Sequence, residues 1–230
     1  MYLHKTNTLI RKMFPRFVWK QETQEKVIYL TFDDGPIPKV TQFVLETLKE
    51  YDAKATFFCV GHNILKNPSI FHTILDAGHQ VGNHTHNHFN AWETEDQLYY
   101  QNVAECRLVM EKELQKTGKM NRVRLFRPPY GKLSYKQAKY LSTDYQLIMW
   151  DVLSGDFDPQ LSPKKCLEKS ISCTEKGSIV VFHDSIKTEK CIRYVLPHYL
   201  DYFSKQGFRF DKIMPYVHEK SIDTHFHLNL

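Results

Sequence analysis

The chain has 230 residues, of which 42% are hydrophobic and 25% charged, a balance typical of a globular domain. This length suits one domain with a buried core and excludes a second enzyme domain. The formal net charge of +5 comes from the first 20 residues, which carry five basic side chains and no acid. The rest of the chain is neutral, and because nucleic-acid binders usually have a basic face, we expect no nucleic-acid partner.

Residues 1–25 are predicted to form a basic N-terminal arm, which packs its aromatic side chains onto a single domain of residues 26–230. Contact of this arm with an anionic membrane surface is the alternative. The arm lacks the apolar segment of a signal peptide, and no stretch is long enough to span a bilayer. Five dispersed cysteines without a C-x-x-C pair indicate reduced thiols. The sequence therefore predicts a cytoplasmic protein and gives no indication of its oligomeric state.

Short apolar runs alternate with longer amphipathic segments along the chain. The expected strands are Val27–Phe32, Ala55–Val60, Gln80–Asn83, Val123–Arg127, Gln146–Asp151, Ser178–Phe182 and Phe208–Ile213. The expected helices cover 38–51, 66–77, 93–117, 134–143, 162–175 and 188–205. Ser162 followed by Pro163 marks a helix start, and Gly78, Gly118, Gly177 and Gly207 follow helical segments as C-terminal caps. This alternation predicts an α/β fold with about seven parallel strands, either a (β/α) barrel or an open doubly wound sheet.

Polar side chains gather where the expected strands end, which is where parallel α/β folds place their functional groups. These strand-end segments are Thr31–Pro36, Asn83–His88, Arg127–Gly131, Asp151–Asp156 and His183–Asp184. No G-x-G-x-x-G or P-loop follows the first strand, so nucleotide binding has no support. The convergence of five strand ends on one region predicts a single active site there.

Two of these segments suggest metal chemistry. An Asp-Asp-Gly-Pro string is by itself also a good turn, so Asp33 and Asp34 alone are weak indicators. Three histidines within residues 84–88 are uncommon in a core, where each needs hydrogen-bond partners. Two imidazoles and one carboxylate are a normal set of zinc ligands that leaves a position for water. The histidine string lacks the glutamate of an H-E-x-x-H helix, so we expect Asp33 to supply the base.

In this order, the strings resemble the motifs of the polysaccharide deacetylase family, also called the NodB homology domain of carbohydrate esterase family four. The matching segments are Thr31–Pro36, His84–His88, Arg127–Gly131, Asp156-Phe157 and Val181–His183. The resemblance covers residues 26–213 and implies a distorted (β/α) barrel similar to a TIM barrel. It also implies a metal-dependent hydrolase that removes N-acetyl groups from N-acetylglucosamine-containing poly- or oligosaccharides, an N-acetylated glycan being the partner.

The resemblance also implies a role for each matching residue. Asp34, His84 and His88 would hold one divalent metal, zinc in the first place, with cobalt or nickel as alternatives. Asp33 would be the general base and His183 the general acid. Arg127 would hold Asp33, Asp156 would orient His183, and the Tyr130 backbone N–H would bind the oxyanion. The substrate would be lined by Phe157, Val181, Pro128 and Pro129.

The chain departs from the family pattern at the fourth motif. Phe157 stands where tryptophan is usual, so we expect a roomier acyl pocket. An aspartate often found at the position of Leu153 is absent, which leaves Asp151 and Asp158 as alternatives to Asp156 for the partner of His183. A related sugar O-acetyl esterase, a small-amide hydrolase and a catalytically inactive carbohydrate-binding relative are the competing functions. The motifs do not indicate which glycan is used.

Overall fold

Strands and helices alternate along the chain in a computed structural model that describes residues 2–118 and 123–216. The strands within these ranges are β1 Phe17–Val18, β2 Val27–Asp33, β3 Ala55–Cys59, β4 Gln80–Asn83, β5 Leu125–Phe126, β6 Gln146–Ile148, β7 Val152–Leu153, β8 Ile179–His183 and β9 Arg209–Phe210. The α-helices are α1 Thr8–Met13, α2 Val40–Glu50, α3 Gly61–Lys66, α4 Pro68–Asp76, α5 Asp96–Lys116, α6 Tyr135–Leu141, α7 Pro163–Cys173 and α8 Glu189–Lys205. Two 3₁₀ turns, η1 Pro129–Gly131 and η2 Ile186–Thr188, complete the set.

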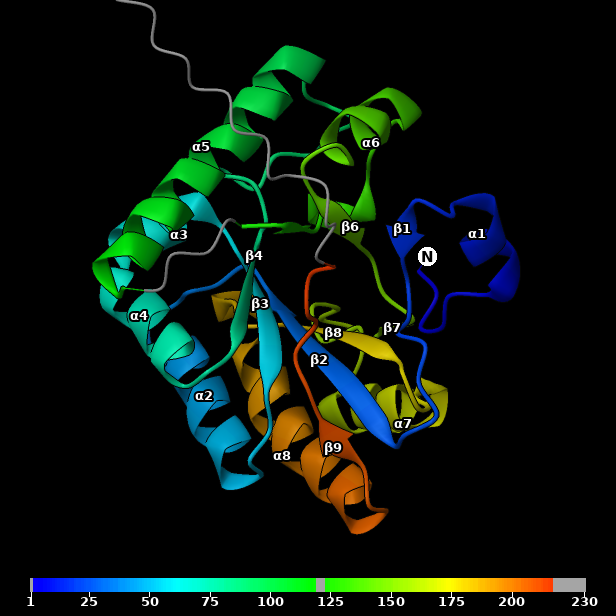
Figure 1. Cartoon of the computed structure of the whole chain (residues 1–230). Coiled ribbons are helices and arrows are strands. Elements are labelled where there is room, and N and C mark those ends of the chain that lie inside the picture. The colour runs from blue at the N-terminus through cyan, green and yellow to red at the C-terminus, as the bar shows by residue number, and fades with distance from the viewer. Residues whose placement is uncertain (1, 119–122, 217–230) are drawn as a thin grey trace, which may run out of the picture.

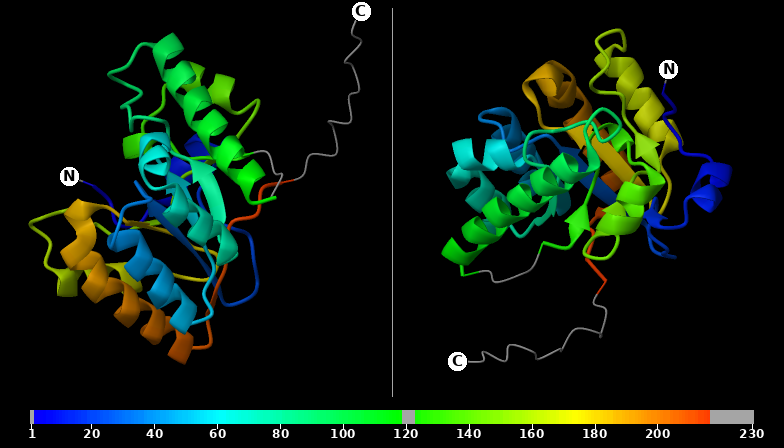
Figure 2. Two further views of the ribbon diagram at one scale, coloured as in Figure 1. Left: turned by 90° about the vertical axis from the view of Figure 1, so that its left-hand side faces the viewer. Right: turned by 90° about the horizontal axis from the view of Figure 1, so that it is seen from above.

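The strands form one sheet in the order β1-β6-β5-β4-β3-β2-β8-β7, with β9 paired to β2, and neighbouring strands run parallel. β6 and β7 lie near opposite ends of this order although only three residues separate them in sequence. The sheet therefore curls into an incomplete barrel with helices packed around its outside (Figures 1 and 2). The predicted distorted (β/α) barrel is confirmed, with nine strands in the described residues in place of about seven.

The alternation of side chains along β2 separates the helix-covered core from the barrel interior. Ile28, Leu30 and Phe32 belong to the main hydrophobic cluster, which includes side chains of the surrounding helices. Tyr29 contacts a second, smaller cluster inside the barrel, whose buried members are Phe58, Leu125, Ile148, Ile179 and Ile213. Asp33 lies four residues after Tyr29 on the same strand, so its side chain points to the same side. The inward row of β2 therefore ends in a carboxylate at the carboxyl edge of the barrel.

The structure corrects several predicted element boundaries. The segment Gln146–Asp151 was expected to be one strand, but the chain bends after β6 and continues as β7 on the other side of the barrel opening. The expected helix 66–77 corresponds to α4, which begins at Pro68 after the chain turns at Asn67, and the preceding helix α3 was not predicted. Strand β1 and helix α1 were missed, although Asn7 caps α1 by accepting a hydrogen bond from Ile10 N.

The predicted helix caps are confirmed. Ser162 caps α7 by accepting a hydrogen bond from the backbone N–H of Lys165. The predicted glycine caps have φ angles of 69° to 79°, in the left-handed region that glycine favours (Gly78, Gly118, Gly177 and Gly207). All five cysteines are free thiols.

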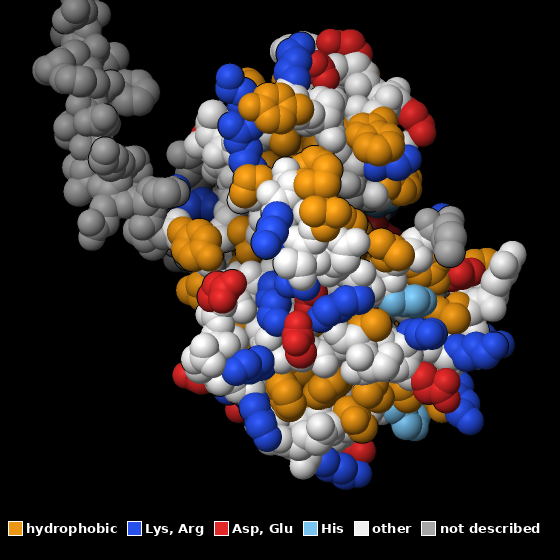
Figure 3. Space-filling view, turned by 90° about the vertical axis from the view of Figure 1, so that its right-hand side faces the viewer, with side chains coloured by type: hydrophobic (Ala, Val, Ile, Leu, Met, Phe, Trp, Pro, Cys, Tyr) orange, Lys and Arg blue, Asp and Glu red, His pale blue; other side chains and the backbone are white. Residues whose placement is uncertain are grey.

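The N-terminal residues lie along the opening of the barrel. β1 pairs with β6, and an antiparallel bridge joins Lys5 to Val152 of β7. Figure 3 shows this side of the molecule, where basic side chains lie among apolar and acidic ones. Within the described residues, no helix is long and apolar enough to cross a membrane. Residues 217–230 of the predicted domain 26–230 lie outside the described part of the chain.

Candidate functional site

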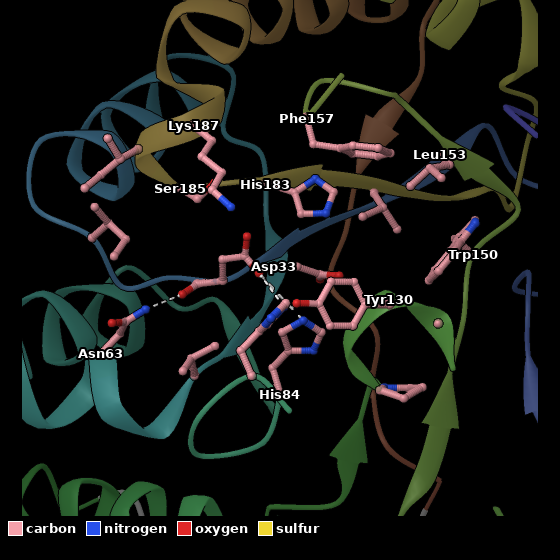
Figure 4. Close-up of a pocket in the computed structure, with 18 of the residues that line it drawn as sticks. Asp33, Asn63, His84, Tyr130, Trp150, Leu153, Phe157, His183, Ser185 and Lys187 are labelled. Carbon is pink, nitrogen blue, oxygen red and sulfur yellow. Dashed lines mark hydrogen bonds and ion pairs between the residues drawn. The ribbon is translucent and has the colours of Figure 1, made fainter. Parts of the chain in front are cut away.

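A cleft of about 820 Å³ opens at the carboxyl edge of the sheet. Asp33 and Asp34 reach it from the end of β2, His84 and His88 from the loop after β4, and His183 from the end of β8. Strands β2, β3, β4 and β8 are parallel neighbours, so their carboxyl ends lie at one edge. Figure 4 shows Asp33, His84 and His183 pointing toward one another. The structure thus brings together residues that the sequence places as much as 150 positions apart.

Asp33 is held by a buried arginine. Its Oδ1 accepts a hydrogen bond of 2.7 Å from Nη1 of Arg127, which is 0% exposed. The same guanidinium donates to Thr31 Oγ1 at 2.7 Å and to the carbonyls of Ile148 and Met149 at 3.2 and 2.8 Å. Burial lowers the pKa of Arg127, whereas the charge of Asp33 raises it. The carboxylate of Asp33 therefore has a fixed orientation and a counter-charge inside the barrel.

Asp34, His84 and His88 form a cluster in which the potential ligand atoms lie within 4.8 Å of one another. Nε2 of His88 is 3.1 Å and Nε2 of His84 is 3.8 Å from Oδ1 of Asp34. Burial lowers the pKa of His84 to about 4, so this imidazole is neutral at pH 7. Its Nδ1 lies 2.7 Å from the carbonyl of Arg127, which can only accept, so Nδ1 carries the hydrogen. The lone pair of Nε2 then faces Asp34, as in histidines that bind metals.

Two observations test whether this cluster fits a divalent metal. Oδ1 of Asp34 is buried and has no hydrogen bond of regular geometry among the described residues, although Nε2 of His88 lies 3.1 Å from it. Burial raises the pKa of Asp34, but the neighbouring His88, His183 and His84 lower it more, so that it lies below its usual range. An ionised carboxylate with a buried oxygen beside two imidazole nitrogens is a suitable donor set for zinc. The three residues therefore fit the metal site expected from the sequence.

His183 is paired with Asp156 at the edge of the cluster. Its Nδ1 lies 2.8 Å from Oδ1 of Asp156, whose Oδ2 accepts a hydrogen bond from the His183 backbone N–H. Burial lowers the pKa of His183, but Asp156 raises it more, to about 10. The alternatives left open by the sequence have other partners. Asp151 accepts hydrogen bonds from Lys5 and Ser178, and Asp158 accepts one from Tyr2.

Three residues around the cleft have backbone conformations that are unusual outside glycine. Asp34, His88 and Tyr130 have φ angles of 85°, 57° and 61°. Such conformations cost of the order of 1–3 kcal/mol each when they are strained, and they concentrate at functional sites. The ring of Tyr130 packs against His88 with centroids 4.8 Å apart, and its side chain is 60% exposed. The turn of η1 therefore lies directly beside the proposed metal ligands.

Some of the residues that line the cleft were predicted from the sequence, and others were not. Phe157, Val181 and Pro128 line it as expected, whereas Pro129 is buried and lies outside the lining. The lining residues that were missed include Tyr2, Asn63, Trp150, Leu153 and Lys187. Except for Leu153, which lies within the segment Asp151–Asp156, they fall outside the predicted strand-end segments, and the fold brings them to the cleft.

Comparison with known proteins agrees with the resemblance. A family model described as polysaccharide deacetylase matches residues 20–147. A peptidoglycan-N-acetylglucosamine deacetylase of Bacillus cereus is 32% identical over 210 residues, covering 87% of this chain and 93% of the relative. A peptidoglycan-N-acetylmuramic acid deacetylase of Bacillus subtilis, PdaA, is 31% identical over 222 residues, covering 94% and 80%. These matches confirm the family and the class of hydrolase inferred from the motifs.

Solved structures share the fold. The crystal structure of a peptidoglycan N-acetylglucosamine deacetylase in complex with 4-naphthalen-1-yl-N-oxidanyl-benzamide gives a TM-score of 0.81 at 23% identity, covering 90% of this chain and 95% of that one. A pseudoenzyme of carbohydrate esterase family four from Bacillus anthracis gives a TM-score of 0.74 at 25% identity, covering 86% and 67%. The family fold thus occurs both in proteins named as deacetylases and in a protein named as a pseudoenzyme.

Proposed function

Because the chain belongs to the polysaccharide deacetylase family, we propose that it is a metal-dependent hydrolase that removes N-acetyl groups from glycans containing N-acetylglucosamine. The observation that carries this proposal is a single cleft that holds a metal-ligand cluster, a buried carboxylate and a histidine–aspartate pair. Each group needed for amide hydrolysis has a candidate there. The names of the relatives support peptidoglycan as the first glycan to test.

Asp34, His84 and His88 would hold the ion, and their nitrogen and oxygen atoms favour zinc, with cobalt or nickel as alternatives. When bound, a divalent ion at this position supplies Lewis acidity toward water and the acyl oxygen. The neutral state of His84 and the ionised state of Asp34 are the forms that metal binding requires.

Asp33 would act as the general base that takes a proton from the attacking water. Arg127 keeps one oxygen of this carboxylate engaged, so the other is available for the proton. The backbone N–H of Tyr130 would donate a hydrogen bond to the acyl oxygen as its negative charge develops. Its place in the η1 turn, beside His88, supports this role.

His183 would be the general acid that protonates the leaving nitrogen. With a pKa raised to about 10, it carries the required proton at pH 7. Asp156 holds the imidazole by Nδ1, which leaves Nε2 to donate. An amine leaves only when protonated, whereas an alkoxide from an ester needs this less, so the paired histidine favours the amide over the O-acetyl ester.

An inactive carbohydrate-binding relative is the competing function, and the Bacillus anthracis pseudoenzyme is the reason to test it. The presence of Asp33, Asp34, both metal-binding histidines and His183 in one cleft supports an enzyme instead. Acetate release from peptidoglycan, chitooligosaccharides and poly-N-acetylglucosamine, each with zinc, cobalt or nickel, tests the proposal. Release of acetate from none of them, by protein that has bound metal, would contradict it.

The predicted cytoplasmic location and the division into residues 1–25 and 26–230 stay predictions. Fractionation of cells that make an epitope-tagged full-length chain tests the first. Recovery mainly from the medium or the periplasm would contradict it, and the glycan substrate would then be sought outside the cell.

A further inference from the structure

The N-terminal arm reaches the rim of the cleft through Tyr2. The backbone N–H of Leu153 donates to the carbonyl of His4 at 3.0 Å, and that of Thr6 donates to the carbonyl of Asp151 at 2.9 Å. Nζ of Lys5 lies 2.7 Å from Oδ2 of Asp151, whose side chain is 0% exposed. These contacts hold residues 2–6 against β7, so Tyr2 has a defined place in the cleft wall.

Tyr2 packs onto the loop that joins β7 to α7. Its hydroxyl donates to Oδ2 of Asp158 at 3.0 Å, and its ring centroid lies 5.1 Å from that of Phe157. Gly155 admits this contact, because a Cβ atom there would lie 2.6 Å from the Tyr2 hydroxyl oxygen. Burial and the Asp158 carboxylate raise the pKa of Tyr2 to about 12, so the phenol keeps its proton as a donor over the neutral range.

The same loop forms the side of the cleft next to His183. The ring of Phe157 meets the imidazole edge-on, with centroids 5.3 Å apart, and Leu153 and Val181 line the cleft with it. Figure 4 shows Phe157 and Leu153 beside His183. When an acyl group is attacked at a point between the metal-ligand cluster and His183, its alkyl part lies close to this apolar wall. An apolar wall suits that substituent because burying apolar surface is favourable.

We propose that Tyr2 is a specificity-determining residue, whose ring completes the apolar wall of Phe157, Leu153 and Val181 and limits the length of the acyl group. The inference rests on the proposed function, because it takes the substrate to be an N-acylated sugar. It also changes the expectation from the sequence that phenylalanine in place of tryptophan leaves a roomier pocket. A ring from the N-terminal arm lies against Phe157 and takes up space on that side.

The test compares kcat/KM of the zinc-loaded full-length protein for chitotetraose carrying N-propionyl or N-acetyl groups. One methylene in an apolar pocket changes this ratio by about tenfold or more, so Tyr2→Ala should raise the propionyl-to-acetyl ratio about tenfold. Tyr2→Phe keeps the ring and should keep the wild-type ratio. Phe14→Ala is the matched control, since Phe14 is an arm aromatic that is 47% exposed and packs on Phe17 outside the cleft lining.

Calorimetric titration with acetate and propionate separates the failure of this inference from that of the proposed function. Tyr2→Ala should tighten the binding of propionate relative to acetate by a similar factor. If the wild type releases no acyl group but Tyr2→Ala changes the ratio of propionate to acetate binding, Tyr2 lines the acyl side of the cleft and the proposed substrate is wrong. If Tyr2→Ala, with an unfolding transition like that of the wild type, leaves both ratios unchanged, the inference about Tyr2 is wrong.

Discussion

Replacement of Arg127 by methionine removes the only cation that the structure pairs with Asp33 among the described residues. The guanidinium is 0% exposed and makes four hydrogen bonds, of which two go to side chains and two to backbone carbonyls. It also lies 4.2 Å from the ring centroid of Phe58. Methionine preserves some of the apolar contact and none of the charge. The substitution therefore leaves Asp33, which is 3% exposed, without its ion-pair partner.

Breaking a buried ion pair by removing one partner costs about 3–5 kcal/mol, because the remaining charge is unpaired in a medium of low dielectric constant. We expect Arg127→Met to lower the free energy of unfolding by about 4 kcal/mol. A domain that is stable by about 5–15 kcal/mol can lose this amount and still fold. Adding Asp33→Asn removes the unpaired charge, so the double variant should be more stable than Arg127→Met alone.

Urea unfolding of metal-free protein at pH 7 measures these free energies without a contribution from the ion. Arg209→Met is the matched control. Its guanidinium side chain is 56% exposed and pairs with Glu25 and Asp211 at the surface, where such pairs contribute about 0–1 kcal/mol. If Arg127→Met costs no more than Arg209→Met, or if Asp33→Asn destabilises the Arg127→Met variant further, the buried ion pair does not have the role described.

Three further predictions concern the site. His84→Ala should lower the content of divalent metal several-fold in elemental analysis, and equal content would reject the ligand assignment. Asp33→Asn should keep the metal and lower acetate release by about two to four orders of magnitude, whereas activity near that of the wild type would place the base elsewhere. Asp156→Asn should lower the pKa of His183, because burial lowers this pKa and the ion pair raises it to about 10. The general acid must be protonated, so the alkaline fall in kcat/KM should move down by about 1–3 pH units, and an unmoved profile would contradict the pairing.

The position of the site was predictable because its residues follow directly from the strand ends. Val27–Phe32 is an apolar run that any parallel sheet would bury, and the carboxylates come next in sequence. The same holds for His84 after β4 and for His183 at the end of β8. Parallel neighbours have their carboxyl ends at one edge, so residues that follow these strands lie at the same edge of the sheet once the strands pair.

Closure of the barrel was not predictable from local pattern. The segment Gln146–Asp151 reads as one apolar run, and nothing in it marks the bend that sends β6 and β7 to different neighbours. The bend depends on pairing with distant segments, since β6 lies between β5 and β1 and β7 lies beside β8. For the same reason the lining residues Trp150 and Leu153 were missed. Their side chains reach the cleft because the chain crosses the barrel opening between β6 and β7.

The sequence also leaves open which aspartate pairs with His183, because the answer depends on contacts with distant segments. Asp151, Asp156 and Asp158 are equivalent by residue type and lie within eight positions of one another, so the motif alone does not separate them. The structure separates them by what else each carboxylate meets. Asp151 meets Lys5, and Asp158 meets the Tyr2 hydroxyl, both from the N-terminal arm. The arm thus engages the two competing carboxylates and leaves Asp156 to the histidine.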